Sequence, residues 1–137
     1  MQSKEDRLKA VPLFSHCSKR ELEFLASRVD EVSLPARKTL LVQGQPTDTF
    51  YILLDGEVEV SVDGQPVRQL HAGDFFGEIG MLDRGLATAS VTTTKPVNTL
   101  ALSHGQFRDA IKGNDALVLQ VMAAMAQRLR ENATQLV

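Results

Sequence analysis

Residues 73–91 read GDFFGEIGMLDRGLATASV, and this stretch decides how the rest of the chain is interpreted. Gly77 and Gly80 allow the main chain to approach a ligand closely, because glycine has no Cβ. Residues 78–82 are long enough for one helical turn, whose first N–H groups lack intrahelical partners and favour an anion. Glu78 would repel that anion unless its carboxylate faces sugar hydroxyls, for which it is a good acceptor. The stretch therefore predicts a backbone cradle that suits a phosphorylated sugar.

Two motifs in this stretch resemble the phosphate-binding cassette of cyclic nucleotide-binding domains, the superfamily of catabolite activators and protein kinase A regulatory subunits. They are FGEIGML at 76–82 and ATASV at 87–91. Other segments are similar to the first helix, the jelly-roll strands and the closing helix of that family, namely 11–15, 43–46, 50–53, 56–60 and 125–130. Because the similar segments extend over nearly the whole chain, the resemblance implies a single cyclic nucleotide-binding-like domain over residues 1–137.

The resemblance implies a mainly β fold with flanking helices. We expect N-terminal helices over 4–30, a jelly-roll β-barrel over 31–102 that contains the cassette 73–91, and C-terminal helices over 103–137, of which the last is long. In the family, the proximal half of the last helix covers the barrel, and the distal half dimerises or closes over the base. The chain is therefore expected to be a regulatory signalling module that relays ligand binding through its C-terminal helix.

The resemblance also implies a set of ligand-binding positions: Phe76, Gly77, Glu78, Ile79, Gly80, Arg84, Ala87, Thr88, Ala89 and Asn132. Glu78 would accept a hydrogen bond from the ribose, while N–H groups near Gly77 and Ala89, together with Thr88, would hold the cyclic phosphate. A threonine at position 88 resembles guanine-tolerant members, so the expected ligand is cAMP or cGMP. Asn132 falls where a base contact is made in the family; a solvated position on the helix is the alternative.

The cassette departs from the family pattern at Ala87, where family members carry a phosphate-binding arginine, and at Leu86, where they carry proline. A charge-assisted hydrogen bond contributes about 1.5–3 kcal/mol, so its absence predicts affinity lower by roughly ten- to a hundredfold. Arg84 is the nearest replacement cation, with a solvated turn residue as its alternative role. The departure supports a second hypothesis, a degenerate fold without nucleotide that serves as a dimerisation or protein-interaction module.

Composition excludes several classes of partner. The chain has 137 residues, 43% of them hydrophobic, which suffices for one globular core. Its formal net charge of −2 argues against a nucleic-acid surface on this chain, because phosphate neutralisation needs clustered Lys and Arg. No apolar run approaches the roughly 20 residues that span a bilayer. We expect a cytoplasmic protein, or a cytosolic domain of a larger protein, with its output domain or partner protein outside this chain.

The sequence also argues against an enzyme. His16, His71 and His104 show no metal-ligand spacing, and neither paired carboxylates nor a P-loop is evident. No metal is therefore expected, although a haem sensor that uses His71 or Cys17 remains an alternative. Cys17 is the only cysteine, and we expect it to pack as a small hydrophobe beside a helix start.

Local patterns predict the first elements of the chain. A short helix over 4–11 should end at Pro12. Ser18 and Glu21 form a capping-box pattern that should begin a helix over 19–28.

Strand patterns follow. Residues 58–62 alternate valine with polar residues, which predicts one buried face, and Asp63–Gly64 predicts a hairpin turn to a partner strand over 65–70. A further pair of strands over 91–102 should be broken near Lys95–Pro96. The hydroxyls of residues 92–94 are expected on an ordinary outer strand face.

The C-terminal third predicts two helices. Ser103 and Gln106 form a second capping box, Gly113 should end that helix, and Asn114 or Asp115 should cap the next one. The last helix, over 116–135, is expected to carry one apolar stripe made of Val118, Val121, Met122, Met125, Leu129 and Leu136. This stripe has two alternative partners, the chain's own barrel and the same helix of a second copy in a homodimer, and we expect both contacts.

Overall fold

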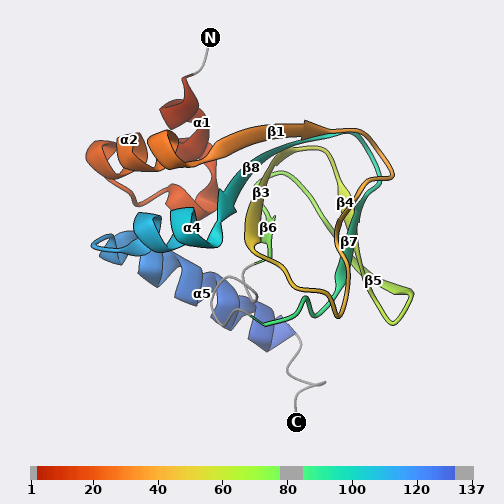
Figure 1. Ribbon diagram of the computed structural model, residues 1–137. Coiled ribbons are helices and arrows are strands. Elements are labelled where there is room, and N and C mark those ends of the chain that lie inside the picture. Colours follow the sequence, from red (N-terminus) through yellow and green to blue (C-terminus); the bar gives the residue numbers. More distant parts are fainter. Residues whose placement is uncertain (1–2, 78–84, 132–137) are drawn as a thin grey trace. The chain divides into compact units, whose positions relative to one another are not determined.

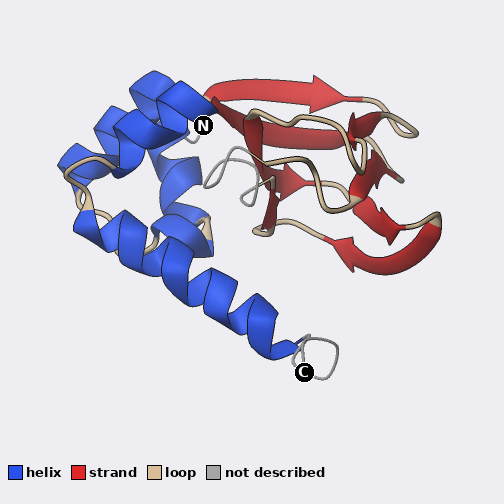
Figure 2. Ribbon diagram, turned by 60° about the horizontal axis from the view of Figure 1, so that its bottom comes forward, coloured by secondary structure: helices blue, strands red, loops and turns tan. Residues whose placement is uncertain are grey.

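The computed structural model describes residues 3–77 and 85–131, and the chain divides into two compact units. Unit 1 comprises Met1–Ser27 and Ala110–Val137, and unit 2 comprises Arg28–Asp109. All strands of the described residues lie between Asp30 and Ser103, with helices before and after them (Figure 2). The predicted mainly β fold with flanking helices is therefore confirmed.

Unit 2 is built from two four-stranded antiparallel sheets that face each other (Figure 1). The first has the order β1 (Asp30–Leu34), β8 (Val97–Ser103), β3 (Thr49–Asp55), β6 (Phe75–Phe76). The second has the order β2 (Thr39–Leu41), β7 (Ser90–Thr93), β4 (Val58–Val62), β5 (Gln65–Leu70). The strands predicted on either side of Lys95–Pro96 are present as β7 and β8, and they enter different sheets.

The hairpin between β4 and β5 forms as predicted. Asp63 and Gly64 have φ angles of 53° and 79°, as the two central residues of a type I′ turn require. In β4 Val58 is fully buried and the other four residues are half-buried. Val58 and Val60 pack against the same apolar cluster, so one face of the strand is directed inward as predicted. The pairing register shifts after Val60, where Ser61 faces Pro66. Proline has no N–H to donate to the ladder, which accounts for the irregular pairing at this position.

Thr93 corrects the expectation of a hydroxylated outer face. It is only 1% exposed, and its Oγ1 donates to the Pro35 carbonyl at 2.7 Å and accepts from the Lys38 N–H at 2.8 Å. Its backbone N–H donates to the Lys38 carbonyl at 2.8 Å, and its carbonyl accepts from the Arg37 N–H at 2.7 Å. Arg37 has a φ of 67°, which is unfavourable for a residue with a Cβ. One buried threonine therefore fixes the turn between β1 and β2.

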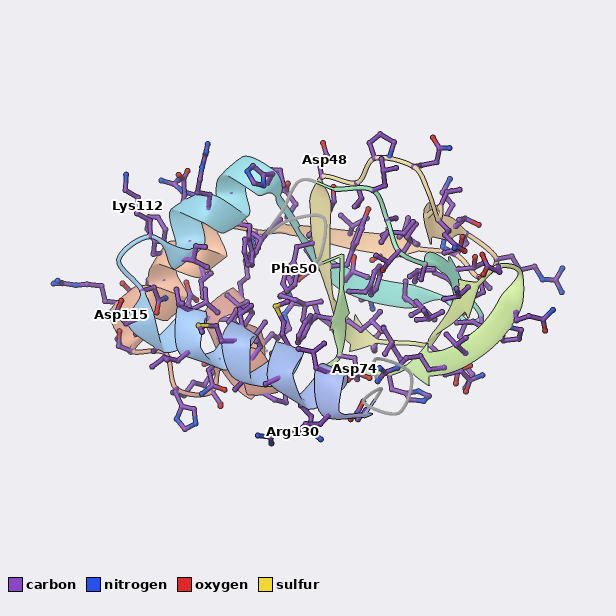
Figure 3. The ribbon with its side chains drawn as sticks, turned by 90° about the horizontal axis from the view of Figure 1, so that it is seen from below. Asp48, Phe50, Asp74, Lys112, Asp115 and Arg130 are labelled. Carbon is purple, nitrogen blue, oxygen red and sulfur yellow. The ribbon has the colours of Figure 1, made fainter. Side chains whose placement is uncertain are left out.

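Alternate residues of the strands fill two apolar layers of unit 2. The layer between the sheets consists of Leu41, Leu53, Val58, Leu70, Phe76, Ala87, Val91 and Val97, and we call it the inner cluster. On the other face of the first sheet, the ring of Phe50 lies 5.4 Å from Phe75 and 5.0 Å from Phe107 of α4 (His104–Ile111). In Figure 3, Phe50 lies in the interior and Asp48, two residues earlier, lies at the surface.

Unit 1 contains α1 (Lys4–Ala10), the 3₁₀ helix η1 (Pro12–Phe14), α2 (Lys19–Arg28) and α5 (Asp115–Glu131). The capping box of α2 is confirmed, since the Ser18 N–H donates to Glu21 Oε1 at 2.7 Å and the Glu21 N–H to Ser18 Oγ at 3.2 Å. Cys17 is buried as predicted, and this burial raises the pKa of its thiol. The side chain therefore stays uncharged and packs as a small hydrophobe.

The predicted start of α4 is also confirmed, because Ser103 and Gln106 bond reciprocally at 2.8 and 3.2 Å. Gly113, with a φ of 77°, follows the helix end. Asn114 is the cap of α5, and its Oδ1 accepts from the Leu117 N–H at 3.0 Å.

The single apolar stripe expected on α5 was wrong. Leu117, which was not included, and Val121 are buried one turn apart in the helix, which packs against η1. Met122 and Leu129 are 60% and 58% exposed. Since burial is decided by the tertiary neighbour, the stripe divides into a buried face and an exposed one; Leu136 lies outside the described residues.

Candidate functional site

The first side of the cassette is formed by β6 and the residue after it. The Phe76 ring stacks on Tyr51 with centroids 5.0 Å apart and planes inclined by 20°. Gly77 has a φ of 90°, and a Cβ there would overlap the carbonyl oxygen of Thr49. Glycine is thus required at position 77 because the main chain passes close to β3, whereas the sequence alone suggested a close approach to a ligand.

The second side begins at Ala87, which is held by its backbone on both sides. Its N–H donates to the Gln45 carbonyl and its carbonyl accepts from the Gly44 N–H, both at 2.9 Å. The preceding residue, Leu86, bridges to Pro46. The methyl group of Ala87 is buried in the inner cluster, and Phe76 belongs to the same cluster. The fold therefore brings Phe76 and Ala87 together and surrounds position 87 with apolar side chains.

Thr88 and Ala89 follow this anchored residue. Thr88 is exposed and Ala89 is half-buried. Neither backbone N–H has a hydrogen-bond partner among the residues that the structure describes. Ser90, directly after them, is fixed because its Oγ accepts from the Gln43 N–H at 3.0 Å. Consecutive N–H groups without partners can hold an anion, so these two donors suit a phosphate.

The other predicted ligand-binding positions lie outside the described residues. They are Glu78, Ile79, Gly80, Arg84 and Asn132. The helical turn predicted over 78–82 lies there as well. For these positions the roles stay predictions.

Tyr51 is a lining residue that the sequence reasoning did not single out. Its ring contacts Phe76, and burial, the largest cause, raises the pKa of its hydroxyl group. Tyr51 and Leu53 occupy the same face of β3 because side chains alternate along a strand. The period of two was available as a signal, but it does not tell which face of the strand lies inward.

The described ranges contain neither a metal-ligand cluster nor a membrane-spanning helix. No group of three or more His, Cys, Asp and Glu side chains there is arranged to hold a metal ion. His71 Nδ1 lies 3.7 Å from Glu57 Oε2, which makes a pair at the surface. None of the helices in these ranges is both long and apolar enough to cross a bilayer.

Comparison with known proteins identifies a matching family and several similar proteins. A family profile described as "Cyclic nucleotide-binding domain" matches residues 31–114. The chain is 36% identical over 104 residues to the cAMP-dependent protein kinase regulatory subunit of Aspergillus fumigatus, an alignment that covers 74% of this chain and 25% of that protein. It is 30% identical over 120 residues to the cAMP-activated global transcriptional regulator CRP of Pasteurella multocida, with 83% and 57% covered. The matched region is thus a quarter to just over half of these relatives.

Solved structures of related proteins have the same fold as this chain. The catabolite activator protein of Thermus thermophilus has a TM-score of 0.82 and 26% identity, covering 91% of this chain and 61% of that one. The regulatory subunit of a cAMP-independent protein kinase A from Trypanosoma brucei has a TM-score of 0.80 with 93% and 46% covered. At 22% identity the latter shows the fold alone.

Proposed function

The chain belongs to the cyclic nucleotide-binding domain family, and from this premise we propose that it binds cAMP or cGMP in the cassette 73–91 and relays binding through α5. The observation that carries the proposal is the pair of N–H groups at Thr88 and Ala89, which have no partner within residues 3–77 and 85–131 and follow the anchored Ala87. In this pose the two N–H groups and the Thr88 hydroxyl bind the cyclic phosphate, and Glu78 accepts from the ribose. The other predicted positions line the same cradle.

We expect the affinity for the nucleotide to be lower than that of a site with a buried arginine. No cation is present at Ala87, and its neighbours in the inner cluster are all apolar. Arg84 is proposed as the replacement cation for the phosphate. A relay also requires that the ligand prefer one arrangement of α5, since equal affinity for both arrangements shifts neither population. In this scheme residues 1–137 act as one cytoplasmic regulatory domain, not an enzyme, and the output domain or partner protein lies outside the chain.

Calorimetric titration with cAMP and cGMP tests this function directly. We expect saturable binding by the wild-type domain, and Glu78→Ala should weaken it by at least about tenfold, because a charged acceptor on the ribose is lost. Glu59→Ala, which removes a carboxylate from β4, is the matched control. Equal affinity of the Glu78→Ala and wild-type proteins would reject the pose. No binding by the wild type, with binding by Ala87→Arg, would favour the second function below.

A second function, dimerisation or protein docking without nucleotide, is favoured by the exposed face of α5. Leu119, Met122 and Leu129 are 63%, 60% and 58% exposed. With Ala123 and Ala126 between them, they recur every three or four residues and form one apolar stripe. The proposed occupant is the same helix of a second copy, because a closed dimer buries this face on both copies at once. This stripe replaces the one predicted from sequence.

Sedimentation analysis tests the dimer. Met122→Glu should dissociate it, because a charge at the centre of an apolar interface is costly to bury. Gln127→Glu, which adds the same charge outside the stripe, should leave the association state unchanged. A dimer that survives Met122→Glu would contradict this function, as would a wild-type protein that is monomeric at all concentrations.

A further inference from the structure

A second concave site lies within unit 2, and it adjoins the cassette through Tyr51, whose ring also stacks on Phe76. β1 and β2 are edge strands of different sheets, and the turn 35–38 joins them although they do not pair with each other. The cavity between them, which we call the seam pocket, has a volume of about 420 Å³, inside the usual range for ligand sites of roughly 300–1,000 Å³. None of its lining residues is one of the predicted nucleotide-binding positions.

Strand register explains which side chains line the seam pocket. Asp30, Val32 and Leu34 alternate along β1 and so lie on one face of the first sheet. In the same sheet Ala101 is the cross-strand neighbour of both Asp30 and Tyr51, which continues the lining over β8 and β3. Thr49 and Ser103 lie on the same wall, which therefore combines apolar side chains with hydroxyl groups.

The opposite wall comes from β2. The pairing of β2 with β7 shifts between Thr39 and Leu41. Such a bulge re-aims a side chain, so the adjacent residues Leu40 and Leu41 both contact the inner cluster, and Leu40 also lines the pocket.

Opposite charges lie at the two ends of the seam pocket. Lys38 follows the turn after Leu34, and Asp30 begins β1, so about 13 Å of strand separates their ends of the pocket, at roughly 3.3 Å per residue. Neither side chain forms an ion pair with any residue in 3–77 or 85–131. At the Asp30 end, the Oε1 of Gln106 accepts from the Ser103 N–H at 2.8 Å, which leaves the amide NH₂ as a donor toward the pocket.

We propose that the seam pocket binds a short peptide with free termini, extended along β1, its ammonium group at Asp30 and its carboxylate at Lys38. Three extended residues span roughly 10 Å, and an ion pair at each end supplies the remaining length. Small apolar side chains suit the wall formed by Val32, Leu34 and Leu40. A simple anion would be repelled by Asp30, and a single amino acid is too short to reach both charges, so a zwitterion of this length fits best.

Trialanine is the probe, and backbone amide NMR with calorimetry on the whole chain is the measurement. We expect saturable shifts confined to the strands that line the seam pocket, β1, β2, β3 and β8, and to the start of α4, with no displacement by cAMP. Lys38→Met and Asp30→Asn should each weaken binding about two- to fivefold, the scale of an exposed ion pair, whereas Lys95→Met on the turn before β8 should not.

Two further ligands make the test specific. N-acetyl-trialanine amide keeps the length but has no terminal charges, and free alanine keeps the charges but not the length; both should bind at least about fivefold more weakly. The proposal is overturned if trialanine does not saturate the shifts at millimolar concentration. It is equally overturned if the capped peptide binds as well as trialanine, or if Lys38→Met and Asp30→Asn behave like Lys95→Met.

Discussion

Replacing Ala87 by arginine tests the structure and the proposed function together. Ala87 is 6% exposed, its N–H and carbonyl are already bonded, and every other member of the inner cluster is apolar. A guanidinium placed there meets no anionic partner among the described members of the inner cluster. Leaving a buried charge uncompensated costs about 3–5 kcal/mol. For a chain of this length, that corresponds to a fall in Tm of about 10 °C or more.

Ala87→Leu is the matched control, since it adds volume without charge and overpacking alone costs about 1–3 kcal/mol. The difference between the two variants isolates the effect of charge. A cyclic nucleotide that pairs with the guanidinium should restore stability, by about 2.7 kcal/mol at a concentration one hundred times its Kd.

Thermal unfolding followed by circular dichroism, with and without cAMP, measures both effects. We expect a low Tm for ligand-free Ala87→Arg and a larger rise with cAMP than for Ala87→Leu. If ligand-free Ala87→Arg melts at the wild-type temperature, the side chain reaches solvent and position 87 is not enclosed by the inner cluster. If cAMP raises the Tm of both variants equally, the guanidinium does not bind the phosphate.

Three further predictions concern stability and are measured by denaturant or thermal unfolding. Thr93→Val should lower the free energy of unfolding by about 2–4 kcal/mol, because two hydrogen bonds are lost in a buried site, and Thr94→Val at an exposed site by under about 1 kcal/mol; equal losses would contradict the role of Thr93. Gly77→Ala should cost about 1–3 kcal/mol through its positive φ and the overlap with β3, whereas Gly105→Ala in open space on α4 should be neutral or stabilising. Since burial raises the pKa of the Cys17 thiol, stability should be unaffected below the ordinary thiol pKa and fall as the pH rises through the raised value; Cys17→Ala should remove that alkaline loss, and an unchanged loss would assign it elsewhere.

Elements with local causes were predicted correctly from the sequence. The two capping boxes depend on residues three positions apart, and the Asp63–Gly64 turn depends on two adjacent residues. These preferences involve residues within a few positions of one another, so the local sequence is enough to predict the helix starts and the hairpin turn.

Features that depend on distant neighbours were not predicted. Thr93 is buried because the turn 35–38, more than fifty residues earlier, lies against it. In α5 the periodicity gives apolar positions, but the contact with η1 decides that Leu117 and Val121 are covered while Met122 is not.

The candidate site shows the same division. Spacing within the cassette placed Ala87 at the family's arginine position. This prediction needs only the order of residues. Its enclosure by apolar side chains depends on members of the inner cluster that come from seven different strands. The seam pocket escaped prediction for a similar reason, since Asp30 and Gln106 are brought together only by the register of β1, β8 and β3.

The two backbone bonds of Ala87 also set a mechanical constraint. They tie the end of the cassette to Gly44 and Gln45, in the segment between β2 and β3. Any ligand that displaces residue 87 must break both bonds or move that segment with it. A fluorophore on Val42, which is 52% exposed beside this segment, would therefore report motion of the cassette without touching the ligand.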